Sequence, residues 1–177
     1  MKRRFLKGYE VEIASYHILE DVGLDVPECR YLPEYGITFT DVEDGSYNLE
    51  ELYSRNDGLF EDLEMEGLRR SVSSKILLGD HDIEKRNFII YSEDGSISPV
   101  DFELSGGTGK EKRMELKTRN IIEDTGAEFT YEEVLEEAEE MYGRLDEDKT
   151  FERMDKRGLY TPEVREIREY MDARFGG

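Results

Sequence analysis

Cysteine and histidine are both scarce in this 177-residue chain. The single cysteine, Cys29, excludes an internal disulfide, and we expect it to be a small buried side chain rather than a nucleophile. The one cysteine and two histidines also provide no cluster with the spacing of a zinc site. At this length the chain is most simply one domain, over residues 1–177, with a core of its own.

Long apolar runs are missing as well. Residues 1–12 begin with basic side chains but lack the apolar stretch of a signal peptide. No other segment is long and apolar enough to cross a membrane. The sequence therefore predicts a cytoplasmic protein that does not associate with membranes.

Positive charge is outweighed, with 24 basic residues against 44 acidic ones and a net charge of −20. Such a surface repels phosphates, which argues against a non-specific nucleic-acid binder. The same acidity is typical of a halophilic protein, because concentrated salt screens the repulsion between like charges. The 11 tyrosines and 8 phenylalanines favour a packed fold over a disordered acidic chain.

Hydrophobic patterning predicts an α+β fold, in which strands come early and helices dominate the rest of the chain. Thr130 and Glu133 form a capping-box pattern at the start of the clearest helix, and Pro162 stands at the first turn of the last one. The predicted elements are a helix over 9–22, strands over 30–33 and 37–42 around a turn at 34–36, and helices over 49–53, 59–78, 110–123, 130–145 and 161–175.

Two apolar runs in the middle of the chain are flanked by polar residues. Phe88–Tyr91 and Ile97–Val100 are separated by a segment with an Asp-Gly pair, which predicts a β-hairpin. Asp82 and Asn87 precede the first run and Asp101 follows the second, so we expect these three side chains to face one cleft. Phosphoryl transfer requires such a set, with one carboxylate to orient the attacking hydroxyl and an amide and a carboxylate to hold Mg²⁺.

Any single acidic residue in this chain is ordinarily a solvated surface residue, because 44 of the 177 residues are Asp or Glu. The hypothesis of a site therefore depends on the whole set and its apolar flanks. A calcium loop starting at Asp80 is a further alternative. It fails because Lys85 and Tyr91 stand where such a loop requires Gly and Glu.

Two motifs around the hairpin resemble a known family. Asp82-Ile-Glu-Lys-Arg-Asn87 resembles the catalytic loop of the protein-kinase-like fold, in which four residues separate an Asp from an Asn. Val100-Asp101-Phe102-Glu103 resembles the metal-binding motif of that fold, in the Asp-Phe-Glu form of the choline-kinase and aminoglycoside-phosphotransferase relatives. The resemblance extends over about residues 2–120.

The segments upstream of these motifs resemble the small lobe of the same fold. Glu12-Ile-Ala14 and Gly23–Pro27 resemble the C helix and its exit in RIO-type kinases and in the small kinase of the KEOPS complex. Residues 37–45 resemble the strand and hinge that receive adenine. The resemblance implies a reduced, strand-bearing N-lobe over about 1–45 and a helical C-lobe over about 46–177.

The resemblance also implies a function, an ATP- and Mg²⁺-dependent phosphotransferase whose acceptor is a protein or a small molecule. Asp82 would be the catalytic residue, and Asn87 and Asp101 would bind Mg²⁺. The residues implied to bind the nucleotide are Glu12, Thr40 and Asp41, with Glu10 as the alternative to Glu12 for the C-helix carboxylate that pairs with a phosphate-binding lysine.

The sequence departs from this pattern near its start. A Gly-rich strand–loop–strand is absent there, and Lys2 and Lys7 are the only lysines that precede the C-helix-like segment. The alternative is therefore a pseudokinase, a nucleotide-binding or protein-interaction module without turnover, or a lobe completed by a protein partner. A third possibility is a small acidic interaction protein without a nucleotide site. Gly106–Gly109 are interpreted as a mobile activation-segment loop.

Overall fold

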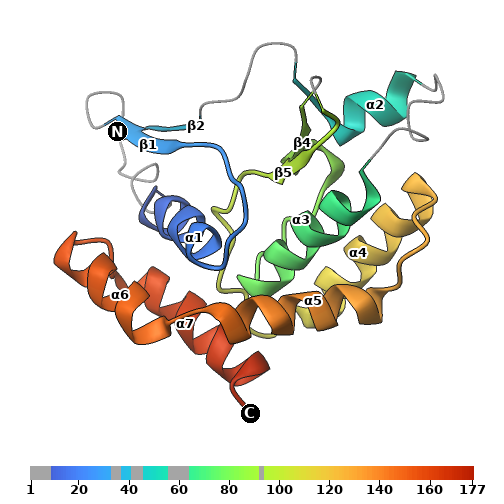
Figure 1. The fold of residues 1–177 in the computed structure, drawn as a ribbon. Coiled ribbons are helices and arrows are strands. Elements are labelled where there is room, and N and C mark those ends of the chain that lie inside the picture. The colour runs from blue at the N-terminus through green and yellow to red at the C-terminus, as the bar shows by residue number, and fades with distance from the viewer. Residues whose placement is uncertain (1–8, 33–36, 41–45, 56–63, 92–93) are drawn as a thin grey trace.

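The computed structural model describes residues 9–32, 37–40, 46–55, 64–91 and 94–177. These residues form a mixed α+β fold in which two small antiparallel sheets lie towards one end of the molecule and most of the helices lie below them (Figure 1). Among the described residues, the helices are all too short or too polar to cross a membrane. The predicted α+β class is confirmed.

The first part of the chain forms a helix and a hairpin, as predicted. Helix α1 (Tyr9–Asp21) leads into strands β1 (Cys29–Leu32) and β2 (Ile37–Thr40), which pair antiparallel with Cys29 opposite Thr40. Cys29 is partly buried and packs against the core. The predicted turn at 34–36 lies outside the described residues. Helix α1 packs against β1 and also against the C-terminal helices α6 and α7 (Figure 1).

The second sheet contains the predicted central hairpin. Its order is β3 (Tyr47–Asn48), β4 (Phe88–Ile90) and β5 (Ile97–Pro99), with helix α2 (Leu49–Arg55) directly after β3. Phe88 lies opposite Pro99 in the antiparallel register. Strand β3 was not predicted, because two residues are too few to show an alternating pattern.

Five further helices follow α2 along the chain. They are α3 (Met65–Leu77), α4 (Glu111–Thr125), α5 (Tyr131–Arg144), α6 (Glu147–Lys156) and α7 (Pro162–Phe175). The predicted helix over 59–78 starts later, since Glu64 has an extended backbone, and residues 56–63 lie outside the described part. The capping box of Thr130 and Glu133 is confirmed.

Helix α3 is the centre of the core. It packs against α5 on one side and against β5 on the other, and its last turn carries the chain into the loop before β4 (Figure 1). Tyr170 of α7 supports this loop, since its hydroxyl donates to the Ile76 carbonyl at 3.0 Å. Gly79 in the loop has a φ of +65°, and a Cβ there would lie 2.8 Å from the Tyr170 ring. The loop therefore requires glycine at this position.

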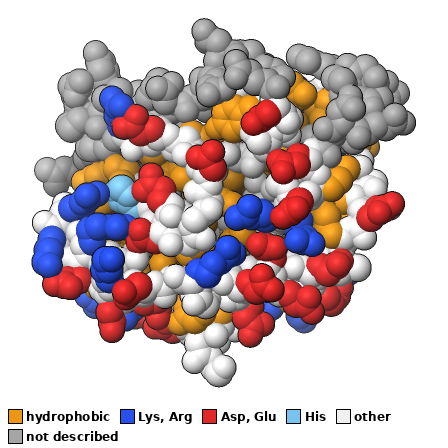
Figure 2. Space-filling model, viewed as in Figure 1, with side chains coloured by type: hydrophobic (Ala, Val, Ile, Leu, Met, Phe, Trp, Pro, Cys, Tyr) orange, Lys and Arg blue, Asp and Glu red, His pale blue; other side chains and the backbone are white. Residues whose placement is uncertain are grey.

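The described surface mixes both signs of charge despite the acidic excess. Figure 2 shows acidic and basic side chains interspersed over the visible face, with basic side chains gathered over α6. Some form exposed pairs within a helix, such as Lys156 with Glu152 at 2.7 Å and Arg119 with Glu115 at 3.0 Å. Exposed pairs of this kind contribute little stability, so the fold depends on its apolar core.

Candidate functional site

The β4–β5 hairpin brings its two polar ends together, as predicted. The Val100 amide donates to the Asn87 carbonyl at 2.9 Å, which continues the strand register beyond Phe88 and Pro99. Val100 is therefore the strand partner of Asn87, and Asp101 is the next residue along the chain. Asn87 itself is buried at the end of the short 3₁₀ turn η2 (Lys85–Asn87).

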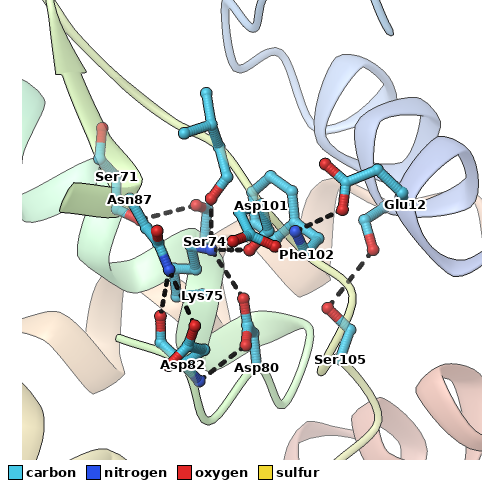
Figure 3. Close-up of polar contacts among 12 residues, drawn as sticks. Glu12, Ser71, Ser74, Lys75, Asp80, Asp82, Asn87, Asp101, Phe102 and Ser105 are labelled. Atoms are coloured by element: carbon cyan, nitrogen blue, oxygen red, sulfur yellow. Dashed lines mark hydrogen bonds and ion pairs between the residues drawn. The ribbon is translucent and has the colours of Figure 1, made fainter. Parts of the chain in front are cut away.

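Asn87 also contacts Asp82 directly (Figure 3). Its side-chain nitrogen Nδ2 donates to the Asp82 carbonyl at 2.9 Å and to Asp82 Oδ2 at 3.2 Å. Both partners on Asp82 are acceptors, so the side-chain atom of Asn87 that faces them is the amide nitrogen. The amide oxygen Oδ1 is therefore directed away from Asp82. An amide oxygen in this position is available to a hard cation.

Asp82 keeps its charge because of its neighbours. Burial opposes ionisation, but hydrogen bonds from Lys117 and Asn87 hold the pKa of the Asp82 carboxyl below its ordinary value. Lys117 Nζ lies 3.3 Å from Asp82 Oδ1, and the Arg86 guanidinium lies 3.8 Å from Oδ2. Asp82 is therefore a carboxylate at neutral pH and can accept a hydrogen bond or a proton.

A fully buried lysine that the sequence interpretation missed lies behind these residues (Figure 3). Lys75, at the end of α3, donates from Nζ to Asp80 Oδ2 at 2.7 Å and to the carbonyls of Val100 at 2.6 Å and Asp101 at 2.5 Å. All three hydrogens of the ammonium thus have acceptors. Asp80 in turn accepts from the Asp82 amide at 2.8 Å, so Lys75 and Asp80 join the two halves of the site.

Asp101 has an unusual backbone conformation. Its φ is 60°, and it is the one non-glycine residue in the described part of the chain with a positive φ. The bonds from Lys75 to the carbonyls of Val100 and Asp101 hold the chain in this left-handed conformation, which Asp tolerates better than most residues. The Asp101 side chain is exposed, whereas the next residue, Phe102, is buried with its ring 4.1 Å from Lys75 Nζ.

Glu12 of α1 reaches the same segment from across the fold. Its carboxyl accepts a hydrogen bond from the Phe102 amide at 2.5 Å (Figure 3). Burial raises the pKa of Glu12 to about 7, although the Phe102 amide and the Lys75 ammonium lower it. One turn further along α1, Ser15 contacts Ser105 at 3.4 Å. Helix α1 therefore fixes the chain that follows Asp101.

The other two predicted nucleotide-binding residues are not brought to this site by the described structure. Thr40 ends β2, and its side chain is not described. Asp41 lies outside the described residues. Their predicted contact with adenine remains a prediction.

The glycine-rich loop after Asp101 is attached to the loop before Asp82. The Gly106 amide donates to the Leu78 carbonyl at 2.8 Å, and the Gly107 amide donates to the Gly79 carbonyl at 2.9 Å. A Cβ on Gly107 would lie 2.8 Å from that Gly79 carbonyl oxygen and 2.9 Å from His81 Nδ1. The two loops are therefore close enough that glycine is needed at position 107.

The ligand chemistry of the site fits a magnesium ion. The described residues include no group of three His, Cys, Asp or Glu side chains that could hold a metal. Asn87 Oδ1 and the Asp101 carboxylate are oxygen ligands, and Mg²⁺ commonly takes one or two protein oxygens together with water and substrate phosphates. Asn87 and Asp101 therefore suit a magnesium ion that arrives with a phosphate ligand.

A cavity of about 270 Å³ lies beside the Asp82–Asn87 loop. Its lining combines the loop with α4, and it includes Glu84, Lys85, Lys117 and Asp124. Lys117 also contacts Asp82, so the cavity adjoins the candidate catalytic carboxylate. No local pattern in the sequence indicates this cavity, because α4 is distant from the loop along the chain.

The comparisons with known proteins do not assign the chain to a family. No protein-family model matches it, and no curated protein sequence matches it. A function has to be inferred from the arrangement of Asp82, Asn87 and Asp101 and from the groups that position them.

Proposed function

We propose that this chain is an ATP- and Mg²⁺-dependent phosphotransferase with a reduced protein-kinase-like fold. The observation that carries the proposal is the double connection of Asn87, which bonds to Asp82 through its side chain and to Val100 through its backbone. Asp82, Asn87 and Asp101 thereby lie at one end of the hairpin. Their order and chemistry match a carboxylate for the acceptor and two oxygen ligands for the metal.

Each residue has a definite part in this proposal. Bound Mg²⁺ would neutralise the charge of the phosphate oxygens that it contacts. Asn87 Oδ1 and the Asp101 carboxylate would hold it, and Asp82 would orient the acceptor hydroxyl and take its proton. Glu12 and Lys75 would act as positioning residues, because they hold the backbone around Asp101 and Phe102.

The proposal is less specific about the part of the fold that would cover the nucleotide. Residues 1–45 would form the reduced N-lobe, with Glu12, Thr40 and Asp41 on the nucleotide side. A protein partner would complete this lobe, because the sequence lacks a Gly-rich strand–loop–strand. The acceptor would be a protein or a small molecule with a hydroxyl group.

Substitution of Asp101 tests the metal site. Asp101→Asn removes the charge, and Asn adopts a left-handed backbone at least as readily as Asp. We expect the variant to fold and to lose most of the thermal stabilisation that ATP and Mg²⁺ give to the wild type. Glu103→Gln is the matched control, because it removes one negative charge from an exposed side chain two residues away. Equal stabilisation of wild type and Asp101→Asn would refute the metal-binding role.

Substitution of Asp82 tests turnover. Asp82→Asn should retain Mg²⁺-dependent ATP binding, measured by calorimetry, but should lose phosphoryl transfer from radiolabelled ATP in molar KCl. The assay uses high salt because salt screens the repulsion between the like charges of the acidic surface. Binding of ATP that does not depend on Mg²⁺ would contradict the proposed chemistry.

The second candidate is a pseudokinase, and the pairing of Asp82 favours it. The carboxylate is engaged by Lys117 and Asn87, and such contacts suit a structural role as well as a catalytic one. A pseudokinase would bind ATP and show no transfer with any acceptor. Nucleotide binding by wild type and Asp82→Asn alike, without turnover by either, would decide for this candidate.

A further inference from the structure

Positive charge close to Asp82 is limited among the described residues. Lys75 is fully buried, and its three hydrogens are directed at Asp80 and two carbonyls. Arg86 has a 58% exposed side chain, which lies closer to Glu84, at 3.0 Å, than to Asp82, at 3.8 Å. Lys117 is therefore the cation best placed to act at the Asp82 carboxylate.

Lys117 reaches Asp82 from α4, which lies 35 residues further along the chain. Its Nζ atom lies 3.3 Å from Asp82 Oδ1 and 2.8 Å from Glu84 Oε1, and its side chain is only 17% exposed. Two of its three hydrogens are directed at these carboxylates, which leaves one for an oxygen that approaches Asp82. Glu84 limits the freedom of the long side chain and so acts as a positioning residue for Lys117.

We propose that Lys117 is a catalytic residue that stabilises the negative charge of the phosphoryl group during transfer. This inference rests on the proposed phosphotransferase function and adds a residue to it. In the step, the acceptor hydroxyl oxygen bonds to the γ-phosphorus and the bond from that phosphorus to the β,γ-bridging oxygen breaks. ADP leaves with the bonding electron pair, and the hydroxyl proton passes to Asp82.

The physical reason is the charge of the surroundings. The reacting oxygens carry negative charge and must approach Asp82 in a chain with a net charge of −20. A preorganised ammonium beside the reacting atoms lowers the free energy of a charged transition state, and it needs little rearrangement to do so. Because Lys117 already lies against Asp82, a phosphoryl group next to this carboxylate would meet Lys117 within hydrogen-bonding range.

The test compares three variants of the full chain in phosphoryl transfer. Lys117→Met should lower kcat by about 100-fold or more, as removal of one charge-stabilising donor commonly does, with a smaller change in KM for ATP. Lys117→Arg keeps the charge and should retain more activity than Lys117→Met. Lys112→Met is the matched control, because Lys112 is an exposed lysine on the same helix. Equal kcat values for the Lys117→Met and Lys112→Met variants would overturn this role for Lys117 and leave the proposed function intact.

A binding measurement provides a readout that does not need turnover. The wild type should bind ATP with Mg²⁺ more tightly than ADP with Mg²⁺, and calorimetry should show this preference reduced in Lys117→Met but not in Lys112→Met. If Lys117→Met keeps the wild-type preference for ATP over ADP, Lys117 does not contact the γ-phosphate and the inference is wrong. Absence of both ATP binding and transfer in the wild type would overturn the proposed function together with this inference.

Discussion

Lys75 and Asp80 form an ion pair with a distance of 2.7 Å between Nζ and Oδ2, and neither side chain has solvent-exposed surface. The pair connects the end of α3 to both halves of the candidate site. Lys75 bonds to the Asp101 carbonyl, and Asp80 accepts from the Asp82 amide. The relative positions of Asp82 and Asp101 therefore depend on two residues that solvent does not reach.

Removal of one member of this pair should be costly. Lys75→Met leaves the Asp80 carboxylate buried without its cation, and we expect a loss of about 3–5 kcal/mol in the free energy of unfolding. Chemical denaturation checks this value. Lys85→Met is the control, because Lys85 and Asp124 form an ion pair that is 22% and 34% exposed and is expected to contribute at most about 1 kcal/mol. Similar losses in both variants would show that burial of Lys75 does not matter.

Glu12 should make stability depend on pH. Its pKa is raised from 4.5 to about 7 in the folded chain, so its favourable contribution is complete below pH 4.5 and is lost as the pH rises through 7. Glu12→Gln cannot ionise, and its stability relative to the wild type should rise by up to about 3 kcal/mol between pH 4 and pH 8.

A control with the opposite sign is available for the pH experiment. Backbone and side-chain hydrogen bonds from Thr130 lower the pKa of Glu133. The Glu133→Gln variant should therefore lose stability relative to the wild type as the pH rises towards 4.5 from below, and the difference should stay constant at higher pH. If the stabilities of the two variants relative to the wild type change in the same direction with pH, the raised pKa does not belong to Glu12.

Two glycine substitutions should have opposite effects. A Cβ at position 107 would meet the Gly79 carbonyl oxygen at 2.8 Å, so Gly107→Ala should displace the loop and destabilise the fold by about 1–3 kcal/mol. Gly143 lies within α5, and a Cβ there would meet no atom within 4 Å, so Gly143→Ala should stabilise by about 0.5–1 kcal/mol. Thermal melting of both variants checks the pair, and a stable Gly107→Ala would show that the two loops separate easily.

The hairpin and its polar ends could be predicted because their signals are local. Apolar runs mark the strands, and Asp82, Asn87 and Asp101 stand just outside them. Lys75 was missed because lysine in a helix is ordinarily exposed. One sign was present in the sequence, since Lys75 occurs among residues 71–80, a segment rich in small and apolar side chains that the structure buries completely.

The remaining features depend on contacts that no local pattern reports. Helix α6 was not predicted, because Phe151 and Met154 are its main apolar residues and too few to establish a helical period. Lys117 resembles any other lysine of an amphipathic helix until the fold brings α4 against the Asp82 loop. The contact of Glu12 with Phe102 was missed for the same reason, although Glu12 was predicted to belong to the site.

The contact between Gly79 and Tyr170 affects the order in which parts of the chain fold during synthesis. The loop before Asp82 packs against a ring contributed by α7, and its neighbour Ile76 accepts the Tyr170 hydroxyl across 94 residues of sequence. During synthesis this partner leaves the ribosome well after α3 and the hairpin, because α7 lies further along the chain. Helix α3 and the hairpin can form earlier, but the loop that carries Asp82 acquires its final support only when α7 has emerged and docked.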